Sequence, residues 1–239
     1  MWPRSPKFAT GTLFLTMLSY PEWLERLAPE EHKFAPKTLH IEGDSSLLFS
    51  GRKVAVVGTR QPTAEGIKRT QAVVQLLVER EITVVSGLAL GVDTVAHTEA
   101  IRLGGRTIAV LPTHLDACSP KSNEHLLNEI KANHLAVSQF GPDSTLNKGD
   151  FIRRNRTMAL LTDATIIIEA SESSGTKHQA WEAVRLNRML LMLESLVSAP
   201  GLDWPKKLMD YGGQVLTREN ASELLDSIPF PIFDGEYGF

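Results

Sequence analysis

Short apolar runs alternate with longer segments of helical periodicity along most of this chain. Runs rich in Val, Ile and Leu occupy positions 54–57, 82–85, 107–111, 135–137, 165–168 and 190–193. Between them, apolar residues recur at helical spacing near 64–80, 91–103, 123–133, 154–162, 178–187 and 204–211. Continuous apolar runs of this length are typical of parallel strands that are buried on both faces. The pattern therefore predicts alternating strands and helices, as in βαβ units.

This alternation predicts the fold class and the domain boundaries. We expect an α/β protein in which a doubly wound, mainly parallel sheet carries helices on both faces. A lead-in strand at 38–41, then a closing strand at 214–216 and a helix at 220–227, complete a domain at 35–228. Residues 1–34, which several prolines punctuate, are expected to form a short helical or irregular extension. Residues 229–239 are expected to form an acidic tail.

Composition limits the compartment in which the protein works. The chain has 239 residues, of which 42% are hydrophobic, enough for one sizeable core. Its single cysteine, Cys118, excludes a disulfide framework within the chain and a cysteine-based zinc cluster, and it is typical of a reducing compartment. The apolar run at 13–18 is too short to span a bilayer, and the cleavage pattern of a secretory signal is missing. We therefore expect a cytoplasmic protein with no membrane partner.

The formal net charge of -3 hides an uneven distribution of charge. Residues 219–239 hold five acidic side chains and no Lys or Arg, so the rest of the chain carries +2 against -5 for this segment. A weakly acidic protein can therefore still contain a local site for anions.

Three glycine-containing turns follow predicted strands and open toward predicted helices. Backbone N–H groups, Ser and Thr hydroxyls and a helix amino terminus together form a cradle for phosphate. Because the carboxyl ends of parallel strands meet at one edge of a sheet, we expect the turns to lie together. They contribute Gly58, Thr59 and Arg60, then Ser86 and Gly87, and finally Ser174, Gly175 and Thr176. Neither a Walker A pattern nor a Gly-x-Gly-x-x-Gly fingerprint is present, which argues against a nucleoside triphosphatase and a dinucleotide dehydrogenase.

A second cluster of candidate residues lies between 148 and 156. Three guanidinium groups and one aromatic ring within six residues suit a partner that offers phosphates and a base for stacking. The cluster contains Phe151, Arg153, Arg154, Asn155 and Arg156. Other roles stay open: Phe151 can belong to the core, and some of the arginines can be solvated or pair with Asp150 and Asp163.

Several of these segments together resemble the DNA-processing protein A family (DprA, also called Smf). The resemblance covers about residues 35–220 and is carried by 58–66, 85–97, 104–111, 151–156, 167–170 and the Ser174-Gly175 pair. It implies an extended Rossmann-like domain that binds single-stranded DNA without sequence preference and passes it to a RecA-type recombinase. It also implies a homodimer without a cofactor, serving DNA uptake and recombination in natural transformation. Longer members carry additional helical and winged-helix-like domains, so the sequence looks like a minimal version.

The resemblance assigns roles to individual residues. Arg60 corresponds to an arginine that contacts a phosphate, and Ser86 and Gly87 fall in the adjoining loop. Lys148 and Phe151 resemble a lysine and a phenylalanine that flank the bound strand. Lys121 resembles a lysine of a neighbouring segment, although Ser119 stands where the family has tyrosine, and Arg153, Arg154, Asn155 and Arg156 line the same neighbourhood. The apolar residues of the closing segment, at 208, 209, 211, 224, 225 and 228, are candidates for the dimer face.

Catalytic chemistry is expected to be absent. Asp93 and His97 share a helix face at four-residue spacing, but we expect both to support the loop at 86–91. Glu169 follows a buried strand, where a carboxylate can accept hydrogen bonds from a loop. The remaining histidines show no spacing typical of metal ligands, so no metal site is predicted; they include His114, His125, His134 and His178.

Two other functions remain open. Phosphoribohydrolases with a similar sheet use a glutamate to help cleave an N-glycosidic bond, but this chain has Gln179 in the corresponding segment, and an amide cannot act as a general base. A nucleotide-sensing module could use the same phosphate cradle for a mononucleotide or a nucleotide-derived signal. Binding of oligo-dT against binding of mononucleotides separates these possibilities.

Overall fold

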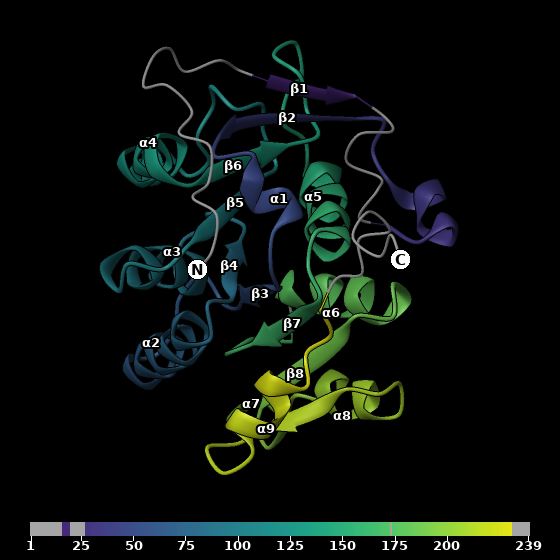
Figure 1. Ribbon diagram of the computed structural model, residues 1–239. Helices are drawn as coiled ribbons and strands as arrows, with labels where there is room; N and C mark the ends of the chain where they lie inside the picture. Colours follow the sequence, from purple (N-terminus) through teal and green to yellow (C-terminus); the bar gives the residue numbers. More distant parts are fainter. Residues whose placement is uncertain (1–15, 20–26, 173, 231–239) are drawn as a thin grey trace, which may run out of the picture.

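One mostly parallel sheet organises the molecule. The computed structural model describes residues 16–19, for the backbone alone, and residues 27–172 and 174–230. Within these residues a nine-stranded sheet has the order β1-β2-β6-β5-β4-β3-β7-β8-β9 (Figure 1). The strands are β1 (Thr16–Ser19), β2 (Thr38–Gly43), β3 (Lys53–Val57), β4 (Thr83–Ser86), β5 (Thr107–Leu111), β6 (Leu135–Ser138), β7 (Ala164–Ile167), β8 (Met189–Leu193) and β9 (Gln214–Leu216).

Seven strands, from β6 to β9 in the sheet order, run parallel, and β1 and β2 add an antiparallel edge. All residues of β3, β4, β5, β6 and β7 are buried, as expected for strands covered on both faces. Chain and sheet order diverge on the two sides of β3, with β4 on one side and β7 on the other. This is the switch point at which an open α/β sheet leaves a crevice for a ligand.

Helices cover both faces of the sheet, so the predicted fold class is confirmed. Apolar residues of α2 (Ala64–Glu79), α3 (Val92–Arg102) and α9 (Ala221–Asp226) pack on one face, and α4 (Glu124–Asn133) continues this layer (Figure 1). The other face is covered by α1 (Ser46–Phe49), α5 (Lys148–Leu160), α6 (Thr176–Arg185), α7 (Glu194–Val197) and α8 (Trp204–Met209). Two 3-10 helices, η2 (Pro29–Phe34) and η3 (Lys121–Asn123), precede β2 and α4.

The start of α5 differs from the prediction. The pattern predicted a helix over 154–162, whereas α5 begins at Lys148. Asn147 caps it, because the Asn147 side chain accepts a hydrogen bond from Gly149 N at 2.9 Å and Asp150 Oδ2 accepts one from Asn147 N at 2.9 Å. This capping box satisfies N–H groups that a helix start leaves free. The arginine cluster therefore lies within a helix rather than ahead of one.

The amino-terminal region also departs from the prediction. Residues 16–19 form β1, which pairs with β2 across the expected boundary at residue 35, so this part of the extension joins the sheet. The 3-10 helix η2 agrees with the short helices expected there. Most of the predicted acidic tail, residues 231–239, lies outside the described residues. Among the described residues, no helix is both long and apolar enough to cross a membrane.

Candidate nucleic-acid interface

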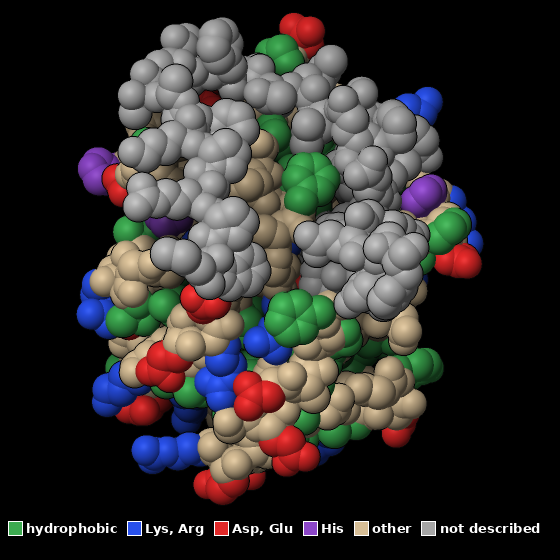
Figure 2. Space-filling model, viewed as in Figure 1, with side chains coloured by type: hydrophobic (Ala, Val, Ile, Leu, Met, Phe, Trp, Pro, Cys, Tyr) green, Lys and Arg blue, Asp and Glu red, His purple; other side chains and the backbone are tan. Residues whose placement is uncertain are grey.

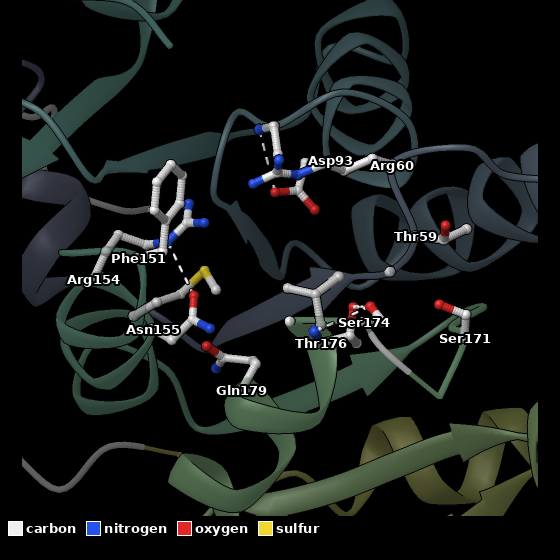
Figure 3. A pocket seen from close by; sticks show the side chains of 15 residues that line it. Thr59, Arg60, Asp93, Phe151, Arg154, Asn155, Ser171, Ser174, Thr176 and Gln179 are labelled. Atoms are coloured by element: carbon white, nitrogen blue, oxygen red, sulfur yellow. Dashed lines mark hydrogen bonds between the residues drawn. The ribbon is translucent and has the colours of Figure 1, made fainter. Parts of the chain in front are cut away.

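A cleft of about 410 Å³ opens at the switch point, where β3 and β7 end. Two of the three predicted turns, together with α5 and the start of α6, line it, and the 86–91 loop contributes Ala89 (Figure 3). The lining side chains and backbone belong to Val57, Gly58, Thr59, Arg60, Ala89, Asp93, Phe151, Arg154, Asn155, Met158, Ser171, Ser174, Gly175, Thr176 and Gln179.

Arg60 and Phe151 stand at the mouth of this cleft. Arg60 is exposed, and its guanidinium carbon lies 5.4 Å from the centroid of the Phe151 ring. In the part of the chain that the structure describes, Arg60 has no ion-pair partner. The ring of Phe151 is only partly buried, so it is available for a cation–π contact or for stacking on a base. The mouth therefore offers a guanidinium and an aromatic face side by side.

The turn that carries Arg60 is fixed by a carboxylate from the neighbouring strand. Thr59 N donates to Glu169 O at 2.7 Å, and the Glu169 carboxylate accepts from Thr63 N at 3.2 Å and from Thr63 Oγ1 at 3.0 Å. Thr63 in turn caps α2 by accepting from Gly66 N at 3.0 Å. Glu169 thus holds the loop in the structural role that the sequence predicted for it.

The loop at 86–91 needs unusual backbone geometry. Leu88 has a φ of 57° and Gly91 a φ of 79°, both in the left-handed region. Asn123 supports it, because its Nδ2 donates to Leu88 O and to Thr94 Oγ1, each at 2.9 Å. Ser86 is fully buried and donates to Val56 O at 2.7 Å, so its hydroxyl joins two strands and does not face the cleft.

Arg154 lies at the floor of the cleft rather than at its mouth. Only 6% of the residue is exposed. Its Nη1 donates to Gly87 O at 2.6 Å and to Val110 O at 3.1 Å, and its Nε donates to Asn155 Oδ1 at 3.0 Å (Figure 3). Most of the hydrogen-bonding capacity of this guanidinium is therefore used within the protein.

Asp93 is the acidic partner of Arg154 at the floor. Asp93 Oδ2 accepts hydrogen bonds from Gly87 N at 3.2 Å and from Ala89 N at 3.3 Å. Burial raises the pKa of Asp93, and the charge of Arg154 opposes that rise. Burial likewise lowers the pKa of Arg154, and the charge of Asp93 opposes that change. Each charge thus offsets part of the desolvation cost of the other.

The third turn supplies hydroxyls and the start of α6. Ser174 Oγ donates to Thr176 Oγ1 at 2.7 Å and accepts from Thr176 N at 3.2 Å. Gly175 is exposed and leaves open space beside its Cα, so a ligand can approach the backbone here. Ser174, Gly175 and Thr176 therefore line the cleft opposite Arg60, as the sequence predicted.

Four predicted residues point elsewhere. Arg153 pairs with Asp150 at 3.3 Å and its side chain is 64% exposed, whereas Arg156 pairs with Glu182 on α6 at 3.0 Å. Lys148, at the first turn of α5, and Lys121, in η3, are exposed. None of these four lines the cleft. A ligand bound in the cleft could reach Arg153 or Lys148 only if it extended out of the cleft along α5.

Some lining residues were not predicted as site residues. Asp93 and Gln179 had been discussed only for other roles, and Ala89, Met158 and Ser171 were not singled out. The position of Met158 in the cleft could have been predicted, because residues 151, 154, 155 and 158 share one face of a helix that starts at 148. The sequence offered no reason to place Asp93 in the cleft, since an acidic side chain is not expected in a site for anions.

The structure describes the surroundings of His97, of Cys118 and of the side chains that could bind a metal ion. His97 is fully buried, its Nδ1 lies 2.7 Å from Thr107 Oγ1, and burial lowers its pKa to about 3. Cys118 is partly buried, and this burial raises the pKa of its thiol. Among the described residues, no three His, Cys, Asp or Glu side chains form a group that could hold a metal ion.

Charges of both signs are interspersed on the surface. On the face shown in Figure 2, Lys and Arg side chains lie among Asp and Glu side chains below the residues drawn in grey. In the coloured part of that face, no extended field of positive charge is seen. Attraction of an anion on this face would have to come from local groups rather than from the overall charge.

Comparison with known proteins agrees with this geometry. The model of the family described as DNA recombination-mediator protein A matches residues 12–228. The chain belongs to this family.

Relatives of known name and structure cover most of the chain. The DNA processing protein DprA of Bacillus subtilis is 28% identical over 92% of this chain and 71% of its own length. The solved structure of DprA from Streptococcus pneumoniae has a TM-score of 0.77 at 34% identity, covering 90% of this chain and 75% of that one. DNA processing protein A from Helicobacter pylori has a TM-score of 0.75 at 30% identity, covering 89% and 96%. In sequence, the chain spans 64% of the Streptococcus pneumoniae protein.

Proposed function

We propose that this protein binds single-stranded DNA without sequence preference through the cleft at the switch point. The observation that carries the proposal is the pairing of Arg60 with the partly exposed Phe151 ring at the mouth of a loop-lined cleft. A guanidinium and an aromatic ring suit the two features that every single strand offers, its phosphates and its bases. The related Helicobacter pylori protein was described for its mode of binding single-stranded DNA, which supports the same ligand here.

The strand is proposed to follow the residues that the turns and α5 present. Arg60, Gly58, Thr59 and the 174–176 turn contact phosphates within the cleft. Phe151 stacks on a base, and Lys148 and Arg153, both exposed on α5, meet the strand outside the cleft. Lys121 and Arg156 lie farther from the cleft and contribute through their charge. Ser86, Gly87, Arg154 and Asn155 shape the floor.

Hand-over of the bound strand to a RecA-type recombinase is the second part of the proposal. The family description, a recombination mediator, supports it. Protection and transfer of single-stranded DNA in natural transformation is the process in which we place it. Stimulation of RecA filament formation on oligonucleotides coated with a single-strand-binding protein tests this step directly. No stimulation would leave DNA binding intact and remove the hand-over.

A homodimer is the third part. Of the closing-segment residues, Leu208, Leu225 and Ile228 are buried in the core, whereas Tyr211 is 61% exposed. The Tyr211 ring stands edge-on to Trp181, at 5.1 Å between centroids. Trp181 is partly buried against the core, so the exposed Tyr211 ring stands on a fixed support, as suits an aromatic residue at the centre of an interface. Light scattering at tens of micromolar should give the mass of a dimer for the wild type and the mass of a monomer for Tyr211→Glu. A monomeric wild type would contradict the proposed dimer.

A competition experiment separates this function from the two alternatives. The cleft volume also suits a mononucleotide, so labelled oligo-dT should be challenged with unlabelled oligo-dT, duplex DNA and nucleoside monophosphates. We expect displacement by the single strand at far lower concentration than by the duplex or the monophosphates. Displacement by a monophosphate at equal nucleotide concentration would favour a sensor. Release of base from a monophosphate would indicate an enzyme, despite Gln179 at the floor.

A further inference from the structure

Arg154 differs from every other arginine of the α5 cluster in its surroundings. Arg154 is 6% exposed, whereas the side chains of Arg153 and Arg156 are 64% and 36% exposed. Both of those neighbours form ion pairs with buried carboxylates, Arg153 with Asp150 and Arg156 with Glu182. Arg154 Nη1 instead donates to two backbone carbonyl groups, that of Gly87 in the loop after β4 and that of Val110 within β5.

Arg154 and Asp93 hold a single peptide segment from both sides. Gly87 O accepts from Arg154 Nη1 at 2.6 Å, and Gly87 N donates to Asp93 Oδ2 at 3.2 Å. The glycine is required by this arrangement, because a Cβ at position 87 would lie 1.6 Å from Arg154 Nη1. The position of the guanidinium and the path of the 86–91 loop therefore determine each other.

The far end of the same loop contacts the turn that carries Arg60. Val92 N donates to Thr59 O at 3.2 Å, and a Cβ on Gly91 would lie 2.4 Å from that same oxygen. The loop thus packs directly against the backbone of the residue that precedes Arg60. A displacement at Gly87 would be passed along a short, tightly packed stretch of backbone to Arg60.

We propose that Arg154 is a positioning residue: it sets the 86–91 loop and, through it, the turn of Arg60, and it makes no phosphate contact of its own. This inference rests on the proposed function. The structure supports it by the saturation of Nη1 and Nε with internal partners and by the carboxylate of Asp93 beside the guanidinium. The rival role is direct contact, because Arg154 also lines the cleft.

The salt dependence of DNA binding distinguishes the two roles. Each phosphate that a cation neutralises contributes about -0.7 to the slope of log affinity against log salt concentration. Oligo-dT binding is measured by fluorescence anisotropy over a salt series for the wild type, Arg154→Gln, Arg60→Ala and the Arg60→Ala/Arg154→Gln double variant. The double variant is compared with Arg60→Ala alone. Because Arg60→Ala already lacks the phosphate contact through which Arg154 is proposed to act, any further change of slope would come from Arg154 itself.

We expect Arg154→Gln to weaken binding at least fivefold, and the double variant to have the same salt slope as Arg60→Ala. A slope that becomes less negative by a further 0.7 or so in the double variant would show direct phosphate contact and overturn the inference. Unchanged affinity in Arg154→Gln would also overturn it. Absence of oligo-dT binding by the wild type would instead contradict the proposed function itself.

Two further variants keep the test sharp. Gly87→Ala retains the charge of Arg154 but displaces its guanidinium, so it should also weaken binding at least fivefold; wild-type affinity would contradict the inference even if Arg154→Gln did not fold. Arg185→Gln removes one positive charge on α6, where Arg185 pairs with Glu182 away from the cleft, and it should stay within twofold of the wild type. Thermal melting of each variant fixes a temperature at which all are folded.

Discussion

The floor and the mouth of the cleft use the same types of residue in opposite ways. At the floor, Arg154 and Asp93 are buried and hydrogen-bonded to the backbone. At the mouth, Arg60 is exposed, its guanidinium carbon lies 5.4 Å from the centroid of the Phe151 ring, and it forms no ion pair with any residue that the structure describes. A guanidinium that is already surrounded by protein partners stabilises a loop, whereas one that keeps its donors free can exchange water for a phosphate. Burial, rather than residue type, therefore separates the residues that shape this site from those that we propose to bind DNA.

The stability of the floor should depend strongly on pH through His97. Burial lowers its pKa to about 3, so the folded protein holds the neutral form and an unfolded chain takes up a proton more readily. Stability is therefore full above pH 6.5 and falls as the pH drops, by up to about 1.4 kcal/mol per pH unit, or about 5 kcal/mol down to pH 3. The free energy of unfolding in urea, measured between pH 7 and 5, checks this.

The matched control for this prediction is His97→Gln. Its unfolding free energy should be lower at pH 7 but should change less between pH 7 and 5 than that of the wild type. His134, whose pKa is also lowered mainly by burial, remains in both proteins, so a difference between them reports on His97 and on its interaction with His134. An equal pH dependence in the two proteins would contradict the role assigned to buried His97.

At the mouth, Phe151→Ala should weaken DNA binding by about 1–3 kcal/mol, because a stacking partner for one base is lost. The loss should be similar for different bases, and the salt slope should not change, since no phosphate contact is removed. Anisotropy with oligo-dT, oligo-dC and oligo-dA measures both.

Phe140 provides the contrast to Phe151. It is 5% exposed, so Phe140→Ala should cost about 3–5 kcal/mol of stability. The folded fraction should lose less affinity than Phe151→Ala, because Phe140 can affect the DNA only through Arg153, whose guanidinium carbon lies 5.1 Å from the centroid of the Phe140 ring. If Phe151→Ala instead destabilised the fold by that amount and left affinity unchanged, Phe151 would belong to the core and the contrast between floor and mouth would fail.

The support of the Arg60 turn predicts a smaller effect on stability. Thr63→Ala removes the cap of α2 and the hydroxyl that donates to Glu169, and the loss of such a cap costs about 1 kcal/mol. Thr63→Ser keeps the hydroxyl and should be close to the wild type. Urea unfolding compares the two variants; equal stability would show that the cap contributes nothing here.

The smallest effect is expected for Arg156. Its ion pair with Glu182 is partly exposed, so Arg156→Gln should lower stability by about 0.2–1 kcal/mol. Because Arg156 does not line the cleft, oligo-dT affinity should fall far less than with Arg60→Ala. A loss of affinity as large as that of Arg60→Ala would place the bound strand along a different face of α5.

The sequence predicted the sheet better than it predicted the orientation of side chains. β5 (Thr107–Leu111) agrees residue for residue with its apolar run, because burial on both faces leaves a continuous signal. β9 (Gln214–Leu216) also has the predicted bounds, although only its last residue is buried. The start of α5 was missed, although Asn147 and Asp150 form a capping box that can be recognised in a sequence. β1 was not predicted, since a short edge strand in a proline-rich segment carries little periodicity.

The missed start of α5 explains why the sequence did not show which residues of the cluster line the cleft. With a helix from Lys148, positions 151, 154, 155 and 158 face the cleft, while 153 and 156 lie on other faces. With the cluster placed at a helix start, some of its arginines were expected to be solvated or ion-paired, but the pattern did not predict which face of the helix each one occupies. The Arg154 side chain points inward because its guanidinium donates to the carbonyl groups of Gly87 and Val110. These acceptors lie far from Arg154 in the sequence, so no local pattern predicts this orientation.

The salt dependence of oligo-dT binding by the wild type and by Arg60→Ala tests the central claim most directly. The account predicts that the wild type prefers single-stranded to duplex DNA, and that Arg60→Ala binds more weakly with a slope less negative by about 0.7, the contribution of one phosphate. Equal binding of single strand and duplex, or an unchanged affinity and slope in Arg60→Ala, would contradict the placement of the DNA site in this cleft.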